Sequence, residues 1–162
     1  MEGDIGLLKA STARSGLVTA DERERRLSPV VERYRFSPFE WGRHDCVLFA
    51  ARCVDAQCGS RFEQRIRSEF RYTTAMEALR LIKQSGGFES VVTQFLGPMV
   101  PPGELELGDV VLGRGPGQFA DCVALGICDE ESFMVPDHQG LAWLSMNLAR
   151  GGWHCPLAEA VD

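Results

Sequence analysis

The clearest pattern along the chain is an apolar stretch between residues 45 and 59, bounded by residues that start and stop helices. Asp45 is a good N-cap, and Gly59 is the residue type that most often ends a helix. Apolar residues fill most positions between them. We therefore predict a largely buried central helix with Cys46 in its first turn.

Helical periodicity also marks the segments on both sides. Thr74 and Glu77 form a capping box, and Gly86-Gly87 closes the helix that it opens. Upstream, Pro29 is typical of a first helical turn. The additional predicted helices are one that starts at Ser28-Pro29 and stops before Ser37-Pro38, and three over 62–70, 75–85 and 88–96.

After the proline-rich stretch 97–103 the pattern changes to short β-prone runs separated by Gly, Pro and Asp. The predicted strands cover 109–112, 122–128, 132–135, 141–145 and 152–155. Helices in the first part of the chain followed by strands in the second indicate an α+β fold with an antiparallel sheet.

Residues 1–33 have a different character from the rest. Small and polar residues dominate up to Ala20, and the charge run Asp21–Arg26 follows, which we expect to be a solvated face. A few apolar residues, among them Ile5 and Leu8, interrupt this background. We predict an N-terminal arm over 1–33 that could order only on a partner, followed by one domain over 34–162.

Composition narrows the possible functions. The chain has 162 residues, of which 44% are hydrophobic and 25% charged, enough for one domain with its own core. Its formal net charge of −6 argues against nucleic-acid binding, and its apolar runs are too short for membrane insertion. No secretory signal and no cofactor motif is visible. We expect synthesis in the cytoplasm and no cofactor.

Cys46 is the candidate nucleophile of the chain. Unpaired backbone N–H groups in the first turn of a helix stabilise a thiolate, so this position lowers the pKa of a cysteine. The simpler interpretation is a small buried hydrophobic residue.

Two motifs carry a resemblance to a known family. Trp41-Gly42-x-x-Asp45-Cys46 before an apolar helix, with Leu107-Gly108-Asp109-Val110-Val111 downstream, resembles the NlpC-type cell-wall peptidases, which are papain-like enzymes. The further order of motifs is similar to a compact branch found among tailed-phage and prophage tail genes: Phe70-Arg71-Tyr72-Thr73, Gly86-Gly87 and Ala124–Ile127. The resemblance covers about 36–155. It implies a papain-like fold with the Cys-bearing helix packed on the C-terminal antiparallel sheet.

The resemblance gives Cys46 the role of nucleophile toward an amide in a peptidoglycan stem peptide. It places the general base at the start of the strand 124–128, where this chain has Ala124, which cannot accept a proton. The third polar residue of the family falls near Val135 or Pro136, so that position also departs from the pattern.

Three histidines are candidate replacements for the base, His44, His138 and His154. His138 ranks first because it follows the strand that should carry the third residue, with Asp137 or Asp121 as a possible orienting carboxylate. His44, two residues before Cys46, is the second candidate.

The cysteines also permit a metal site. Thiolates from the central helix and from one strand could converge on zinc or an iron–sulfur cluster, although their spacing matches no standard motif. The candidate ligands are Cys46, Cys53, Cys58, Cys122 and Cys128.

Three functions remain open. The preferred one is a structural component of a phage tail tip or tail-assembly complex on a degenerate NlpC-type fold, made in the host cytoplasm and located in the virion tail. Its partners would be other tail proteins, bound through the arm. The alternatives are an active cysteine amidase that cleaves peptidoglycan stem peptides through Cys46, and a thiol-ligated metal protein of the same assembly.

Overall fold

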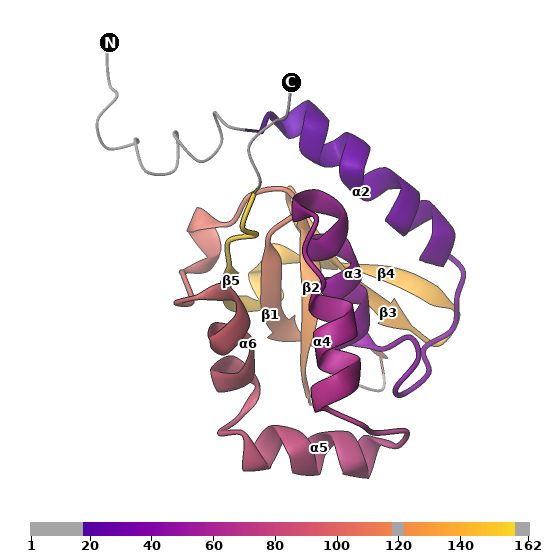
Figure 1. Cartoon of the computed structure of the whole chain (residues 1–162). Coiled ribbons are helices and arrows are strands. Elements are labelled where there is room, and N and C mark those ends of the chain that lie inside the picture. The colour runs from indigo at the N-terminus through magenta and orange to yellow at the C-terminus, as the bar shows by residue number, and fades with distance from the viewer. Residues whose placement is uncertain (1–17, 118–121, 158–162) are drawn as a thin grey trace.

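The computed structural model describes residues 18–117 and 122–157 and has an α+β architecture, with helices packed on a five-stranded sheet (Figure 1). The sheet order is β4-β3-β2-β1-β5, and all paired neighbours are antiparallel. The helices are α2 (Ala20–Tyr34), α3 (Cys46–Cys58), α4 (Phe62–Glu69), α5 (Ala75–Gln84) and α6 (Phe88–Leu96). The strands are β1 (Val110–Arg114), β2 (Val123–Asp129), β3 (Ser132–Asp137), β4 (Gly140–Ser145) and β5 (Ala149–Trp153). This confirms the predicted α+β class.

Local signals place most of these elements. The Asp45 carboxylate caps α3 by accepting the Leu48 N–H at 2.9 Å, and Gly59 ends the helix in the left-handed conformation with φ of 72°. Thr74 caps α5 through the N–H of Glu77. These predictions are confirmed, with small shifts at the far ends of the elements.

The last strand lies further upstream than predicted. It covers Ala149–Trp153 and contains Gly151 and Gly152, whereas we predicted a strand over 152–155. Both glycines are needed inside it, because a Cβ on Gly151 would lie 2.9 Å from the Val100 carbonyl oxygen and one on Gly152 would overlap the carbonyl oxygen of Val110. The strand therefore packs too closely against its neighbours for side chains at these two positions.

Helix α2 corrects two predictions for residues 18–34. It begins at Ala20 behind the N-cap Thr19, whose hydroxyl accepts the Glu22 N–H, so Pro29 lies inside the helix instead of in its first turn. Arg23, in the charge run that we expected to be solvated, is only 3% exposed. This part of the predicted arm packs on the domain, whereas residues 1–17 lie outside the described residues.

The main core lies between the helices and the sheet. Helix α3 is central and contacts α2, α4 and β2. Its Phe49 and Cys53 pack in one apolar cluster with Leu27 of α2 and Trp153 of β5. A smaller cluster on Val111 and Phe133 lies apart from it. No helix within the described ranges is long and apolar enough to cross a membrane.

A buried ion pair joins α2 to the sheet. The guanidinium of Arg23 contacts Asp109 at 2.9 Å and Glu106 at 3.0 Å. Asp109, just before β1, is fully buried and also accepts the backbone N–H groups of Glu106 and Cys155, each at 2.9 Å. One carboxylate thus holds α2, the start of β1 and the segment after β5 together.

We predict that Arg23→Met lowers the free energy of unfolding by about 3–5 kcal/mol, because it removes the arginine charge that faces the buried Asp109 carboxylate. The matched control is Arg25→Met on the same helix, where the arginine is 71% exposed and pairs with Glu22. The control should change stability by less than about 1 kcal/mol. Urea unfolding of both variants tests this, and equal small effects would contradict the assigned role of Arg23.

Candidate functional site

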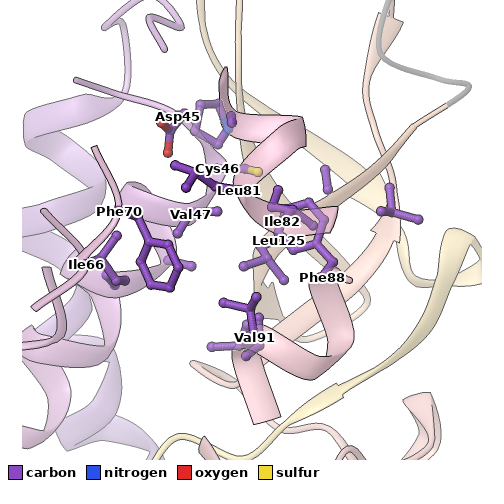
Figure 2. Close-up of a pocket in the computed structure, with 18 of the residues that line it drawn as sticks. Asp45, Cys46, Val47, Ile66, Phe70, Leu81, Ile82, Phe88, Val91 and Leu125 are labelled. Atoms are coloured by element: carbon purple, nitrogen blue, oxygen red, sulfur yellow. The ribbon is translucent and has the colours of Figure 1, made fainter. Parts of the chain in front are cut away.

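Cys46 lies at the start of α3 and faces an apolar cavity. The cavity has a volume of about 410 Å³ and is lined mainly by side chains from α3, α4, α5, α6 and β2. Figure 2 shows the Cys46 sulfur among apolar neighbours that include Ile82 of α5 and Leu125 of β2. The size lies within the range of small-molecule sites.

The apolar surroundings decide the ionisation of Cys46. Burial raises the pKa of its thiol to about 12, and the negative charge of Asp45 acts in the same direction. Backbone N–H groups of Leu125 in β2 and of Cys46 and Val47 at the start of α3 lower the pKa, but they are outweighed. The net effect is opposite to the lowered pKa that we predicted from the position of Cys46 alone.

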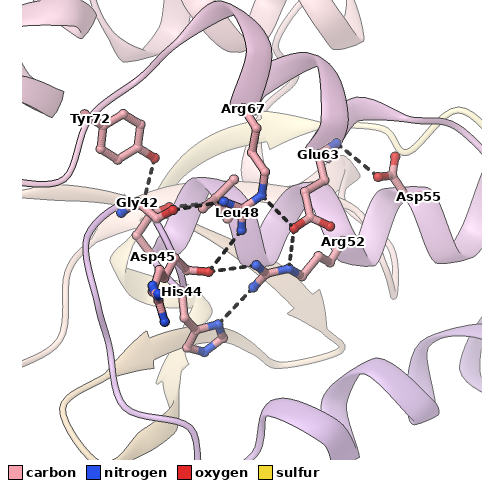
Figure 3. Close-up of polar contacts among 10 residues, drawn as sticks. Gly42, His44, Asp45, Leu48, Arg52, Asp55, Glu63, Arg67 and Tyr72 are labelled. Carbon is pink, nitrogen blue, oxygen red and sulfur yellow. Dashed lines mark hydrogen bonds and ion pairs between the residues drawn. The ribbon is translucent and has the colours of Figure 1, made fainter.

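Asp45 is a structural carboxylate at one end of the cavity. Besides the N–H of Leu48, it accepts the N–H of Gly42 at 3.0 Å and the hydroxyl of Tyr72 at 2.7 Å (Figure 3). Three donors hold its two oxygens in place. Asp45 is therefore a cap that fixes the turn before Cys46, as predicted.

Tyr72 is the site residue that helix and strand patterns did not single out. It comes from the segment between α4 and α5, and its hydroxyl reaches across to the turn that precedes α3. The backbone fits the same contact, because a Cβ on Gly42, whose φ is 80°, would overlap the carbonyl oxygen of Tyr72. The only sequence signal was the Phe70-Arg71-Tyr72-Thr73 motif of the resemblance.

The strand beside Cys46 supplies no proton acceptor. Ala124 and Leu125 of β2 line the cavity together with Pro136 of β3. Among the described residues that line it, the only carboxylate is Asp45, which already binds three donors. The described residues that line the cavity therefore include no histidine, and their one carboxylate is already occupied.

His44 packs among different side chains from those that surround Cys46, and it does not line the cavity. Its ring stacks on Tyr34 at 4.9 Å, and its Nδ1 lies 3.1 Å from the guanidinium of Arg52, which also binds Glu63 (Figure 3). The Nε2 atom of His44 is buried without a hydrogen-bond partner among the described residues. Burial lowers the pKa of His44 to about 4, and the Arg52 charge adds to this. These contacts pack His44 against α2 and α3, and its candidate role as base stays a prediction.

His138 lies in the exposed turn between β3 and β4 and is not among the residues that line the cavity. Its backbone N–H donates to the Asp137 carboxylate at 2.8 Å. Asp121, the other proposed orienting carboxylate, lies outside the described residues. A role for His138 as base thus stays a prediction.

The five candidate metal ligands do not form one site. No group of three or more His, Cys, Asp or Glu side chains in 18–117 and 122–157 is arranged to hold a metal ion. The five cysteines lie in different surroundings: Cys46 faces the cavity, Cys53 lies in the main core, Cys58 contacts Cys155, Cys128 lies in the smaller cluster, and Cys122 is exposed. The geometry therefore does not support the thiol-ligated metal site considered from the sequence.

Comparison with known proteins places the chain in one family. A family model described as a domain of unknown function, DUF6950, matches residues 18–155. The chain belongs to the DUF6950 family. No curated protein and no solved structure matches it. The family match starts at residue 18, so it includes helix α2 in the domain.

His44 should make the DUF6950 domain sensitive to acid. Because its pKa falls from 6.5 to about 4 on folding, the unfolded chain binds the proton more tightly. Above about pH 6.5 His44 is neutral in both states and does not oppose folding. As the pH falls toward about 4, protonation of the unfolded chain lowers the free energy of unfolding by about 2–3 kcal/mol.

The substitution His44→Phe keeps an aromatic ring but removes this titration. Urea unfolding at about pH 7 and pH 4.5 should show a smaller loss of stability in the variant than in the wild type. Carboxylates that titrate in the same range are common to both proteins and cancel in the comparison. An equal loss in both would contradict the assigned state of His44.

Proposed function

We propose that this protein is a structural component of a phage tail tip or tail-assembly complex, built on a degenerate NlpC-type, papain-like fold. The observation that carries the proposal is the environment of Cys46. Its thiol lies in an apolar cavity beside Ala124 and Leu125, with its pKa raised to about 12. A cysteine hydrolase needs a thiolate and a base within hydrogen-bond reach. This argues for a role that depends on binding and not on hydrolysis.

The motifs behind the resemblance gather around this cavity. The turn with Trp41 and Asp45, Tyr72 from the second motif, and Ala124 of the hydrophobic strand all line it. Their meeting at one place supports the view that they belong to one ancestral site. The link to phage tails rests on the resemblance.

Exposed apolar side chains favour a role in assembly. Phe36 is 79% exposed and Trp143 39% exposed, and the guanidinium of Arg35 lies over both rings. On α5, Met76 and Leu79 are 69% and 60% exposed. Aromatic, Met and Arg side chains are enriched at protein interfaces. Residues 1–17 of the predicted arm would add to such contacts.

An active amidase is the competing function, because Cys46 retains the helix N-terminus that a nucleophile uses. Genetic complementation in the phage or prophage that encodes the chain separates the two. We predict that Cys46→Ala restores infectivity to a deletion mutant as fully as the wild type does. Ser68→Ala, at an exposed position of α4 that does not line the cavity, is the matched control.

The same strains test the tail role. Mass spectrometry of purified particles should find the protein at a fixed copy number, and the deletion should yield particles with defective tails. Normal assembly with Cys46→Ala but loss of infection would instead favour the amidase. Complete particles without the protein would contradict the structural role.

A further inference from the structure

Two thiols distant in the sequence meet at the edge of the main core. Cys58 is the last residue of α3, and Cys155 follows the end of β5. Their side chains are hydrogen-bonded to each other, and both belong to the apolar cluster between the helices and the sheet. Each thiol is therefore the other's neighbour in the folded chain.

Contacts that do not involve this thiol pair hold both backbones in place. On one side, Gly59 ends α3, and the Ser60 hydroxyl binds the Asp55 carboxylate at 2.5 Å. On the other side, the N–H of Cys155 donates to buried Asp109 at 2.9 Å. The two positions are thus fixed independently of whether the sulfurs are bonded.

The two thiols differ in exposure and in acidity. Cys58 is half-buried and has the Ser60 hydroxyl at 3.2 Å, whereas Cys155 is fully buried. The hydrogen bond from Cys155 lowers the pKa of Cys58 to about 6, against the opposing effects of burial and the Asp55 charge. The same contact raises the pKa of Cys155 above its usual range. An accessible acidic thiol beside a buried neutral one is the arrangement of an attacking and a resolving cysteine.

We propose that Cys58 and Cys155 form a reversible dithiol–disulfide pair that is oxidised by a low-molecular-weight disulfide such as glutathione disulfide. The proposal stands independently of the function of the Cys46 site, because neither residue lines that cavity.

The exchange has two balanced steps. The Cys58 thiolate attacks one sulfur of glutathione disulfide, forms a mixed disulfide and releases one glutathione thiolate. Cys155 then loses its proton and attacks the Cys58 sulfur, which breaks the mixed disulfide and releases the second glutathione. The protein dithiol loses two electrons and two protons, and glutathione disulfide becomes two molecules of glutathione.

The disulfide would tie the end of α3 to the segment after β5. This segment already binds Asp109, which anchors α2 through Arg23. A cross-link between residues so far apart in sequence restricts the unfolded chain strongly, so the oxidised protein should unfold at a higher temperature than the reduced one.

The test uses the full-length protein equilibrated in glutathione buffers of graded oxidation, followed by alkylation and peptide mapping. We expect two of the six cysteines to become resistant to alkylation together, with a linked peptide pair containing Cys58 and Cys155 that dithiothreitol releases. Cys122→Ser, at an exposed cysteine, should leave this result unchanged.

The single variants separate the two steps. Cys155→Ser should accumulate a stable glutathione adduct at Cys58, and Cys58→Ser should give no adduct at buried Cys155. A wild-type protein that stops at the glutathione adduct of Cys58, or that links other cysteines, would overturn the proposal. The wild-type map alone decides the matter if a variant fails to fold.

Discussion

The ion pair between Arg23 and Asp109 is the constraint on which the architecture depends. Asp109 has no contact with water, yet its two oxygens receive the Arg23 guanidinium, His154 Nδ1 and the N–H groups of Glu106 and Cys155. A buried carboxylate is stable only when such partners surround it. Because they come from α2, from the turn before β1 and from the segment after β5, the first and last described segments are fixed against each other.

Competition between local and tertiary effects explains the state of Cys46. The start of α3 offers it backbone N–H groups, which favour a thiolate, but the apolar cavity that it faces partly shields it from water. Removal from water disfavours the charged form more strongly than the helix terminus favours it. At Cys58 the balance is reversed, because hydrogen bonding with Cys155 and Ser60 outweighs burial at a half-buried sulfur. The cysteine placed like a nucleophile is therefore not the most acidic one.

Features that depend on near neighbours could be predicted from the sequence. The caps Asp45 and Thr74, the left-handed Gly59 and the strands of the second half are local, and the structure has them. Arg23 could not be recognised within a charge run, because its partner Asp109 is distant in the sequence. The start of α2 could have been predicted, since Thr19 is an N-cap whose side chain accepts the Glu22 N–H. We placed the start at Pro29 instead, because proline is typical of a first helical turn. The raised pKa of Cys46 and the pairing of Cys58 with Cys155 depend on tertiary contacts that no local pattern contains.

The most direct test of this account is the alkylation rate of Cys46 as a function of pH from about 5 to 9, followed by peptide mass spectrometry. The other five cysteines serve as internal references, with exposed Cys122 reporting reagent access. The account predicts a rate at Cys46 that is low and still rising at the upper end of this range. A rate at Cys46 that levels off near pH 6–7 would reveal a thiolate at neutral pH and contradict the claim that this site has lost its nucleophile.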